Sequence, residues 1–287
     1  ASPTAMGHDG ENATRVARDP LARLLWRLDL QPLGDDRFRV EPGRGEGRVF
    51  GGFLLAAGIV AAGRTEVAGH PHALHAQFLR SARWGTPIDW RVDRLRDGFA
   101  FATRRVVGAQ GGQDVIALTV GFTAQERGLA HQDPMPPAPD PAGLPDWEDL
   151  RASLLGEAGV RRPPGPIEMR ECDPELAVPA RGRPARRRVW MRPRGTLPDL
   201  PLLHAALLAY ASDRALLTTA GRPHGLVSGP RFAASLDHAL WLHGPCRFDD
   251  WLLVTSESPV AVAGRALALG AFWNRDGRRV ASVAQEA

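Results

Sequence analysis

The fold is decided by the stretch Leu202-Leu-His-Ala-Ala-Leu-Leu-Ala-Tyr-Ala-Ser-Asp-Arg-Ala-Leu-Leu217, which is apolar on almost every side yet contains an aspartate. Its apolar residues recur at helical spacing, so the pattern predicts one helix over residues 202–217 with Asp213 inside an apolar stripe. A helix that is apolar all round is normally buried, and this one is shorter than the roughly 18 residues of a membrane span. A carboxylate in a core is costly unless it is hydrogen-bonded or functional, which makes Asp213 the first candidate for chemistry.

The same plan occurs twice along the chain. A second apolar helix, residues 54–62, follows Phe50-Gly-Gly-Phe53, and strand-like segments follow each helix. These segments are residues 74–79, 88–95, 99–109 and 115–124 in the first half, and 232–242, 251–257, 264–272 and 279–285 in the second, where 167–171 and 186–191 precede the helix. An offset near 160 residues, which also relates Gln125 to Gln285, indicates an internal repeat. We therefore expect an α+β chain with two antiparallel sheets, each wrapped around one buried helix.

Proline marks the expected domain boundaries. Residues 128–163 are rich in proline, enclose a helical segment at 147–155, and are predicted to be a linker. The remaining chain divides into a tail of residues 1–20, a first domain of residues 21–127, and a second domain of residues 164–287 that carries Asp213. The apolar content of 44% over 287 residues is enough for a proper core.

Composition argues against several classes of function. The net charge is only +4, and the 36 basic residues, all arginine, are interspersed among 32 acidic ones, which argues against nucleic acid binding. The cluster Arg186-Arg187-Arg188 is interpreted either as an exposed strand edge or as a site for phosphates of a soluble ligand. Cys172 and Cys246 fit neither a metal motif nor a disulfide scaffold, and residues 1–20 have no apolar signal core. These features predict a cytoplasmic protein without a membrane span.

Several motifs occur in a fixed order along the chain: Phe50-Gly-Gly52, His72-Ala-Leu-His75 with Phe78-Leu-Arg80, Leu95-Arg-Asp-Gly98, Arg104-Arg105, Tyr210-Ala-Ser-Asp213, Asp237-His238 with Trp241-Leu-His243, and Val280-Ala-Ser282 with Gln285-Glu286. Together they resemble the type II acyl-CoA thioesterases, the TesB-like double hotdog proteins, from about residue 20 to the carboxyl end. The resemblance implies hydrolysis of fatty acyl-CoA to free acid and CoA by a homo-oligomer, with no cofactor other than the coenzyme A of the substrate.

The resemblance also implies which residues hold the attacking water, namely Asp213, Ser235 and Gln285. The family more often has threonine where Ser235 stands, a change that keeps the hydroxyl. Glutamine usually follows Phe-Gly-Gly, where this chain has Phe53.

The residues support similar chemistry without the family. The chain has no Gly-x-Ser-x-Gly elbow, no catalytic cysteine setting and no His-Glu-x-x-His motif, which disfavours a covalent serine hydrolase and a metal site. Water activated by a buried carboxylate is then the simplest chemistry, with Asp213 as the base or the water-orienting acceptor. The amides of Gly51 and Gly52, at the start of a buried helix, are candidates to polarise the substrate carbonyl.

Strand alternation gives opposite predictions for Gln285 and Ser235, the two other site residues. Gln285 alternates with Val283 and Ala281, so it should point toward the apolar face of the last strand. Ser235 alternates onto the face of Asp237, away from Phe232, so a bulge or a sheet buried on both faces is needed to bring it into a site. His72, His75, His238 and His243 are interpreted as structural.

Two alternatives remain open. Asp199 and His204 stand five residues apart at the head of the second helix, the spacing of the acid and base in a hotdog enoyl-CoA hydratase, although the rest of that motif is absent. The other alternative is a double hotdog protein that binds acyl chains without catalysis, for which Phe53 is the supporting feature.

Overall fold

The computed structural model describes residues 19–124, 128–156, 162–226, 233–245 and 247–287. The predicted tail is therefore almost entirely outside the described residues, as are Gln125, Phe232 and Cys246. The first half contains α2 (Pro20–Leu28), β1 (Gln31–Gly34), β2 (Arg37–Val40), α3 (Gly51–Gly63), β3 (His70–Phe78), β4 (Ile88–Asp97), β5 (Phe101–Gln110) and β6 (Gln113–Thr123). The connecting stretch contains η1 (Pro141–Gly143) and α4 (Trp147–Leu154). The second half contains β7 (Ile167–Glu171), α5 (Pro174–Ala177), β8 (Arg186–Pro193), α6 (Pro201–Ser212), α7 (Leu216–Gly221), β9 (Asp237–Leu242), β10 (Leu252–Val262), β11 (Arg265–Trp273) and β12 (Arg279–Glu286).

The described strands form one antiparallel sheet in the order β1-β2-β4-β5-β6-β3-β9-β12-β11-β10-β8-β7. The prediction of two separate sheets is therefore wrong. The halves join where β3 pairs with β9, with Leu74 opposite Leu240. This pairing removes two strand edges that separate sheets would have left with unpaired backbone groups.

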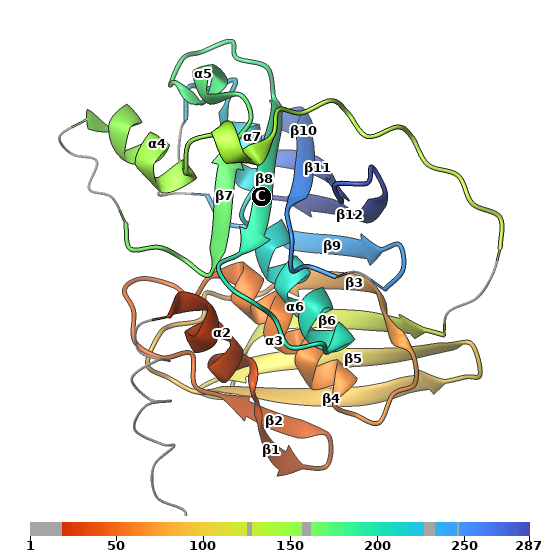
Figure 1. Ribbon diagram of the computed structural model, residues 1–287. Helices are drawn as coiled ribbons and strands as arrows, with labels where there is room; N and C mark the ends of the chain where they lie inside the picture. Colours follow the sequence, from red (N-terminus) through yellow and green to blue (C-terminus); the bar gives the residue numbers. More distant parts are fainter. Residues whose placement is uncertain (1–18, 125–127, 157–161, 227–232, 246) are drawn as a thin grey trace, which may run out of the picture.

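Helices α3 and α6 lie side by side against the sheet (Figure 1). They run antiparallel, because Gly52 of α3 adjoins Tyr210 of α6 while Gly63 adjoins Leu202. Every residue from Gly52 to Ala62 is buried, as is every residue from His204 to Ser212. The two predicted apolar helices thus form one helical layer, which brings the start of α3 beside the end of α6.

The helix predicted over residues 202–217 is interrupted. α6 ends at Ser212, Asp213 is its C-cap, and α7 begins only at Leu216. Asp213 is thus at a helix terminus and not inside an apolar helical stripe. The Asp213 side chain explains the break, because its carboxylate bonds outside its own helix, to the Gly52 N–H of α3. Such side-chain bonds compete with continuation of a helix.

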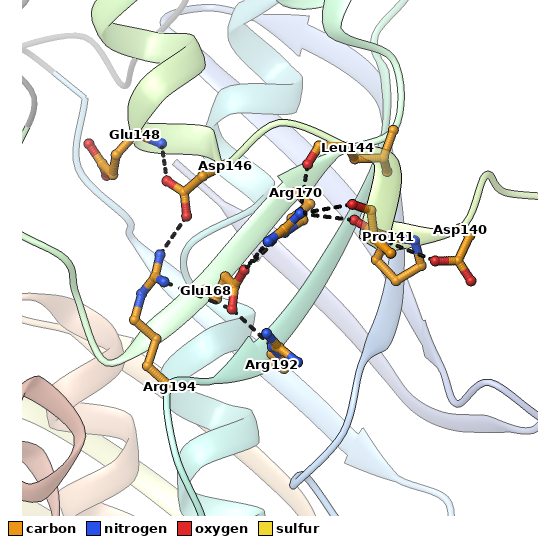
Figure 2. A network of polar contacts seen from close by, with 10 residues as sticks. Asp140, Pro141, Leu144, Asp146, Glu148, Glu168, Arg170, Arg192 and Arg194 are labelled. Atoms are coloured by element: carbon orange, nitrogen blue, oxygen red, sulfur yellow. Dashed lines mark hydrogen bonds and ion pairs between the residues drawn. The ribbon is translucent and has the colours of Figure 1, made fainter.

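The proline-rich stretch is tied to the second half of the sheet by a polar network (Figure 2). Arg170 of β7 donates to the Leu144 carbonyl at 2.9 Å. Glu168, also on β7, accepts from Arg170 at 2.9 Å and lies 3.8 Å from Arg194. Arg194 in turn pairs at 2.6 Å with Asp146, which also caps the start of α4. This network fixes the chain just before α4 against β7 and the end of β8.

The arginine cluster 186–188 lies at the start of β8, where it pairs with β10 on one side, while the register with β7 on the other side begins only at Val189. Of the three side chains Arg186 is exposed and Arg187 is buried, so the interpretation as an exposed strand edge holds only in part. Each of its guanidinium groups faces a carboxylate: Arg186 with Glu257 at 3.9 Å, Arg187 with Glu171 at 2.9 Å, and Arg188 with Asp173 at 2.5 Å. Arg187 and Glu171 are fully buried. The cluster is already neutralised, which leaves little free charge for a phosphate.

Candidate active site

Three predicted residues meet at the junction between the two central helices. Asp213, at the end of α6, accepts a hydrogen bond from Gln285 Nε2 at 3.0 Å through its Oδ1 atom. The same oxygen accepts from the Ser235 hydroxyl at 3.4 Å. Gln285 Nε2 also donates to Ser235 Oγ. Residues from α6, from β12 and from the segment before β9 therefore form a closed triangle of polar contacts.

The start of α3 completes this arrangement from the first half of the chain. The Gly52 N–H donates to Asp213 Oδ2 at 2.8 Å. Phe50, the N-cap residue, makes no side-chain capping bond, so Asp213 supplies the cap of α3 from the other helix. The Gly52 amide is thus engaged with the carboxylate. The preceding amide, that of Gly51, belongs to the first turn, whose N–H groups have no acceptor within the helix.

Glycine is required at both positions by close approach. A Cβ atom on Gly51 would lie 2.8 Å from Asp213 Oδ2 and 3.1 Å from the Phe78 ring. A Cβ atom on Gly52 would lie 2.4 Å from the Tyr210 carbonyl oxygen. Any larger residue would push the helix start away from the carboxylate.

Alternation places Gln285 as predicted, because it is buried on the inner face of β12 with Val283 and Ala281. Ser235 reaches the site for a reason that alternation misses. β9 begins only at Asp237, so Ser235 lies in the preceding irregular segment and is not bound to a strand face. No bulge or two-sided burial is needed.

The structure brings two further residues against the site, His238, which is interpreted as structural from the sequence, and Ser212. His238 is buried, and its Nδ1 lies 3.2 Å from Gln285 Oε1. Its Nε2 lies 2.8 Å from the hydroxyl of Ser212, which is also buried. The available signal was alternation along β9, which turns His238 inward together with Leu240 and Leu242.

The environment holds the two titratable groups in a defined charge state. Burial raises the pKa of Asp213 from 3.8 to about 6, although the hydrogen bonds that it accepts and the nearby Arg214 charge act in the opposite direction. Burial lowers the pKa of His238 from 6.5 to about 4. At neutral pH the site therefore contains an ionised carboxylate and a neutral imidazole.

A cavity of about 480 Å³ opens onto Asp213 and Ser235. Both halves of the chain line it, with Gly51 and Leu54 from α3, Phe78 from β3, and Leu217 from α7. The wall is mainly apolar, while the carboxylate and hydroxyl lie together at one place on it. This cavity can bring an apolar ligand against a fixed polar cluster.

The residues of the hydratase alternative are not arranged as a catalytic pair. Asp199 is exposed and pairs with Arg247 at 2.6 Å. His204 is buried, and its Nδ1 accepts from the Phe248 N–H at 2.9 Å. Phe53, the feature behind the non-catalytic alternative, packs in the core with 3% of its surface exposed.

Comparison with known proteins gives the site its family. A sequence profile described as acyl-CoA thioesterase matches residues 167–287, and one described as acyl-CoA thioesterase N-terminal domain matches residues 41–123. Acyl-coenzyme A thioesterase 8 of Mus musculus is 34% identical over 278 residues, which cover 90% of this chain and 86% of that protein. The chain belongs to the acyl-CoA thioesterase family. It is an enzyme of the type II class, a thioester hydrolase.

Solved structures agree with the thioesterase family and supply the fold. The acyl-CoA thioesterase II TesB2 of Mycobacterium marinum is 35% identical, with a TM-score of 0.74 over 92% of this chain and 95% of that one. A protein from Alicyclobacillus acidocaldarius, described as having a hot dog fold, is 20% identical, with a TM-score of 0.73 over 92% of this chain and 96% of that one. This thioesterase therefore has an α+β hotdog fold.

Within the part of the chain that the structure describes, no helix is both long and apolar enough to cross a bilayer. Over the same residues, no three His, Cys, Asp or Glu side chains converge in a way that could hold a metal ion.

Proposed function

We propose that the enzyme hydrolyses fatty acyl-CoA to free fatty acid and CoA, with the attacking water held by Asp213, Ser235 and Gln285. The observation that carries the proposal is the closed triangle of these side chains, of which Asp213 and Ser235 line the apolar cavity and Gln285 lies behind them. The triangle combines one ionised acceptor with a hydroxyl and an amide, which is a suitable set for orienting a single water molecule.

Asp213 is the general base in this proposal. The water oxygen attacks the thioester carbonyl carbon while the carboxylate takes one proton of that water. Collapse of the tetrahedral intermediate breaks the C–S bond, and the protonated Asp213 returns the proton to the departing CoA sulfur. The products are the free acid and the CoA thiol, and the carboxylate is regenerated. A base with a pKa of about 6 is ionised at neutral pH yet basic enough to accept this proton.

The N-terminus of α3 is the proposed cradle for the oxyanion. Gly51 lines the cavity beside Asp213, and its amide belongs to the first turn of a helix whose positive end points at the site. The Gly52 amide instead holds the carboxylate in place. We therefore assign carbonyl polarisation to Gly51 and positioning of the base to Gly52.

The charge around the cavity suggests how the substrate lies. Arg48 and Arg80 line the cavity, and each donates to a backbone carbonyl, that of Ala233 at 2.6 Å and that of Asp114 at 3.0 Å respectively. Over the described residues, neither guanidinium pairs with a carboxylate, in contrast to the arginines of β8. We propose that they face the phosphates of CoA, while the acyl chain follows the apolar wall.

The remaining features of the enzyme are proposed on the resemblance and the repeat. We propose a double hotdog, with units at residues 21–127 and 164–287 joined by the linker 128–163, because helix and strands recur in the same order in each half. The enzyme is proposed to act as a homo-oligomer, without a cofactor and without binding nucleic acid. Cys172, a buried free thiol, is consistent with the proposed cytoplasmic location.

The test is a panel of saturated acyl-CoA chains with detection of free thiol, run with the parent protein and the Asp213→Asn variant. The proposal predicts thiol release by the parent and a loss of at least about 100-fold in the variant, within the range for removal of a general base. If the parent releases no thiol from any chain length, or the variant is as fast as the parent, the proposal fails. Crotonyl-CoA consumed without thiol release would identify a hydratase instead.

A further inference from the structure

The carboxamide of Gln285 can satisfy its hydrogen-bond partners in only one of its two orientations. At neutral pH Asp213 is ionised, so its Oδ1 atom can only accept hydrogen bonds. Gln285 must therefore turn its NH₂ group toward Asp213 and Ser235, as in the contacts of 3.0 Å to the carboxylate and the shorter one to the hydroxyl. The other end of the carboxamide, Oε1, then points at His238 Nδ1, 3.2 Å away.

That orientation determines the tautomer of His238. Oε1 is an acceptor, so Nδ1 must carry the ring proton and donate it. In the neutral ring Nε2 then has a lone pair, and the hydroxyl of Ser212 at 2.8 Å donates to it. If the proton sat on Nε2 instead, Ser212 would donate to the Ala209 carbonyl, 2.9 Å away, and Nδ1 would present a lone pair to Gln285.

We propose that His238 is a positioning residue for catalysis: its Nδ1–H holds the Gln285 carboxamide with the NH₂ group toward Asp213 and Ser235, while the Ser212 hydroxyl donates to its Nε2 atom. This inference rests on the proposed function. His238 and Ser212 are 1% and 0% exposed, so water does not compete for these bonds, and a buried amide that is free to turn would spend part of its time with the wrong atom toward the carboxylate. His238 acts through Gln285 and does not itself touch the substrate.

Two substitutions of His238 separate positioning from packing. The side-chain nitrogen of asparagine takes the place of Nδ1, so His238→Asn keeps a donor for Gln285. The amide of glutamine reaches the place of Nε2, so His238→Gln keeps a partner for Ser212 but loses the donor to Gln285. Ser256→Ala is the matched control, because Ser256 is also buried and bonds another hydroxyl, that of Thr219 at 2.7 Å, outside the site.

The measurements are kcat, KM and the pH dependence of kcat/KM for acyl-CoA hydrolysis. We expect His238→Gln to lower kcat by about 10- to 100-fold at unchanged KM, because Gln285 is then no longer held toward the charged Asp213 carboxylate; this is the range for loss of one hydrogen bond to a charged group. The acidic limb of the kcat/KM pH profile of this variant should move to higher pH, because the bond from Gln285 lowers the pKa of Asp213 in the parent. Arg214, Tyr210 and His238 are the other titratable groups around this carboxylate, and only His238 is changed. His238→Asn should retain most of kcat and the parental limb, and Ser256→Ala should match the parent.

The inference is overturned if His238→Gln keeps the parental kcat and acidic limb, or if the two His238 variants lose activity equally. Should both fail to fold, the ¹⁵N chemical shifts of the His238 ring in the parent protein decide: a protonated Nδ1 with an unprotonated Nε2 supports the proposal, and a protonated Nε2 overturns it. Failure of the proposed function looks different, since the parent would then release no thiol or Asp213→Asn would remain active.

Discussion

Asp213→Asn is expected to make the protein more stable at alkaline pH while it lowers activity at least about 100-fold. Burial raises the pKa of Asp213 from 3.8 to about 6, so the folded state binds this proton more tightly than the unfolded state does. Stability is then greatest at low pH and falls as the pH rises through this window. A difference of about 2 pKa units corresponds to about 3 kcal/mol of stability lost above pH 6.

Asparagine does not ionise and so avoids this cost. It can still accept the Gly52 N–H, but its own NH₂ group opposes that of Gln285, which costs about 1 kcal/mol. The variant should therefore exceed the parent by about 2 kcal/mol at pH 8. That advantage should shrink by about 2 kcal/mol at pH 4.5, where the carboxyl of the folded parent is protonated.

Urea unfolding of both proteins at pH 8 and pH 4.5 measures this difference. Asp133→Asn, which removes an exposed carboxylate, is the matched control for the loss of one surface charge. A stability advantage of Asp213→Asn that is independent of pH, or that is larger at pH 4.5, would refute the reasoning. It would mean that folding does not raise the pKa of the Asp213 carboxyl.

Two further predictions concern the cavity. Arg48→Gln and Arg80→Gln should each raise KM for acyl-CoA several-fold, because a charged contact to a CoA phosphate is lost. KM for the matching acyl-pantetheine thioester, which lacks those phosphates, should stay unchanged. An equal rise in KM for both substrates would contradict the assignment. Gly51→Ala should lower kcat at least about tenfold, because the new methyl group lies 2.8 Å from the Asp213 carboxylate. Gly165→Ala, with open space around its Cβ position, should match the parent, and steady-state thiol release of both variants decides.

Local pattern predicted most of the secondary structure. The strand predicted at residues 167–171 has those bounds in β7, and the helix predicted at 54–62 lies within α3, which begins at Gly51. Patterns of period two and of helical period predict these elements because the burial of each element follows the same rule along its whole length. The short elements β1, η1, α5 and α7 were missed, since they are held by tertiary contacts more than by their own pattern.

The errors share one physical origin, which is bonding between residues far apart in the chain. The end of α6 is set by a carboxylate that bonds Gly52 of the other half, and no glycine or proline marks that break in the sequence. The single sheet depends on β3 pairing with β9, which neither strand specifies alone. From the sequence, only the family resemblance brings Asp213, Ser235 and Gln285 together. His238 is interpreted as structural from the sequence, and its contact with Gln285 is seen only in the structure.

The pH dependence of kcat/KM for acyl-CoA hydrolysis tests the central claim most directly, namely that the half-buried carboxylate of Asp213 is the base that activates the water. Thiol release by the parent between pH 5 and pH 8.5 should fall tenfold per pH unit below an apparent pKa of about 6, the value to which burial raises that of Asp213. Asp213→Asn should be slower at every pH and should lose this acidic limb. A parental rate that is flat across this range, or an Asn variant that keeps both the rate and the limb, would contradict the account.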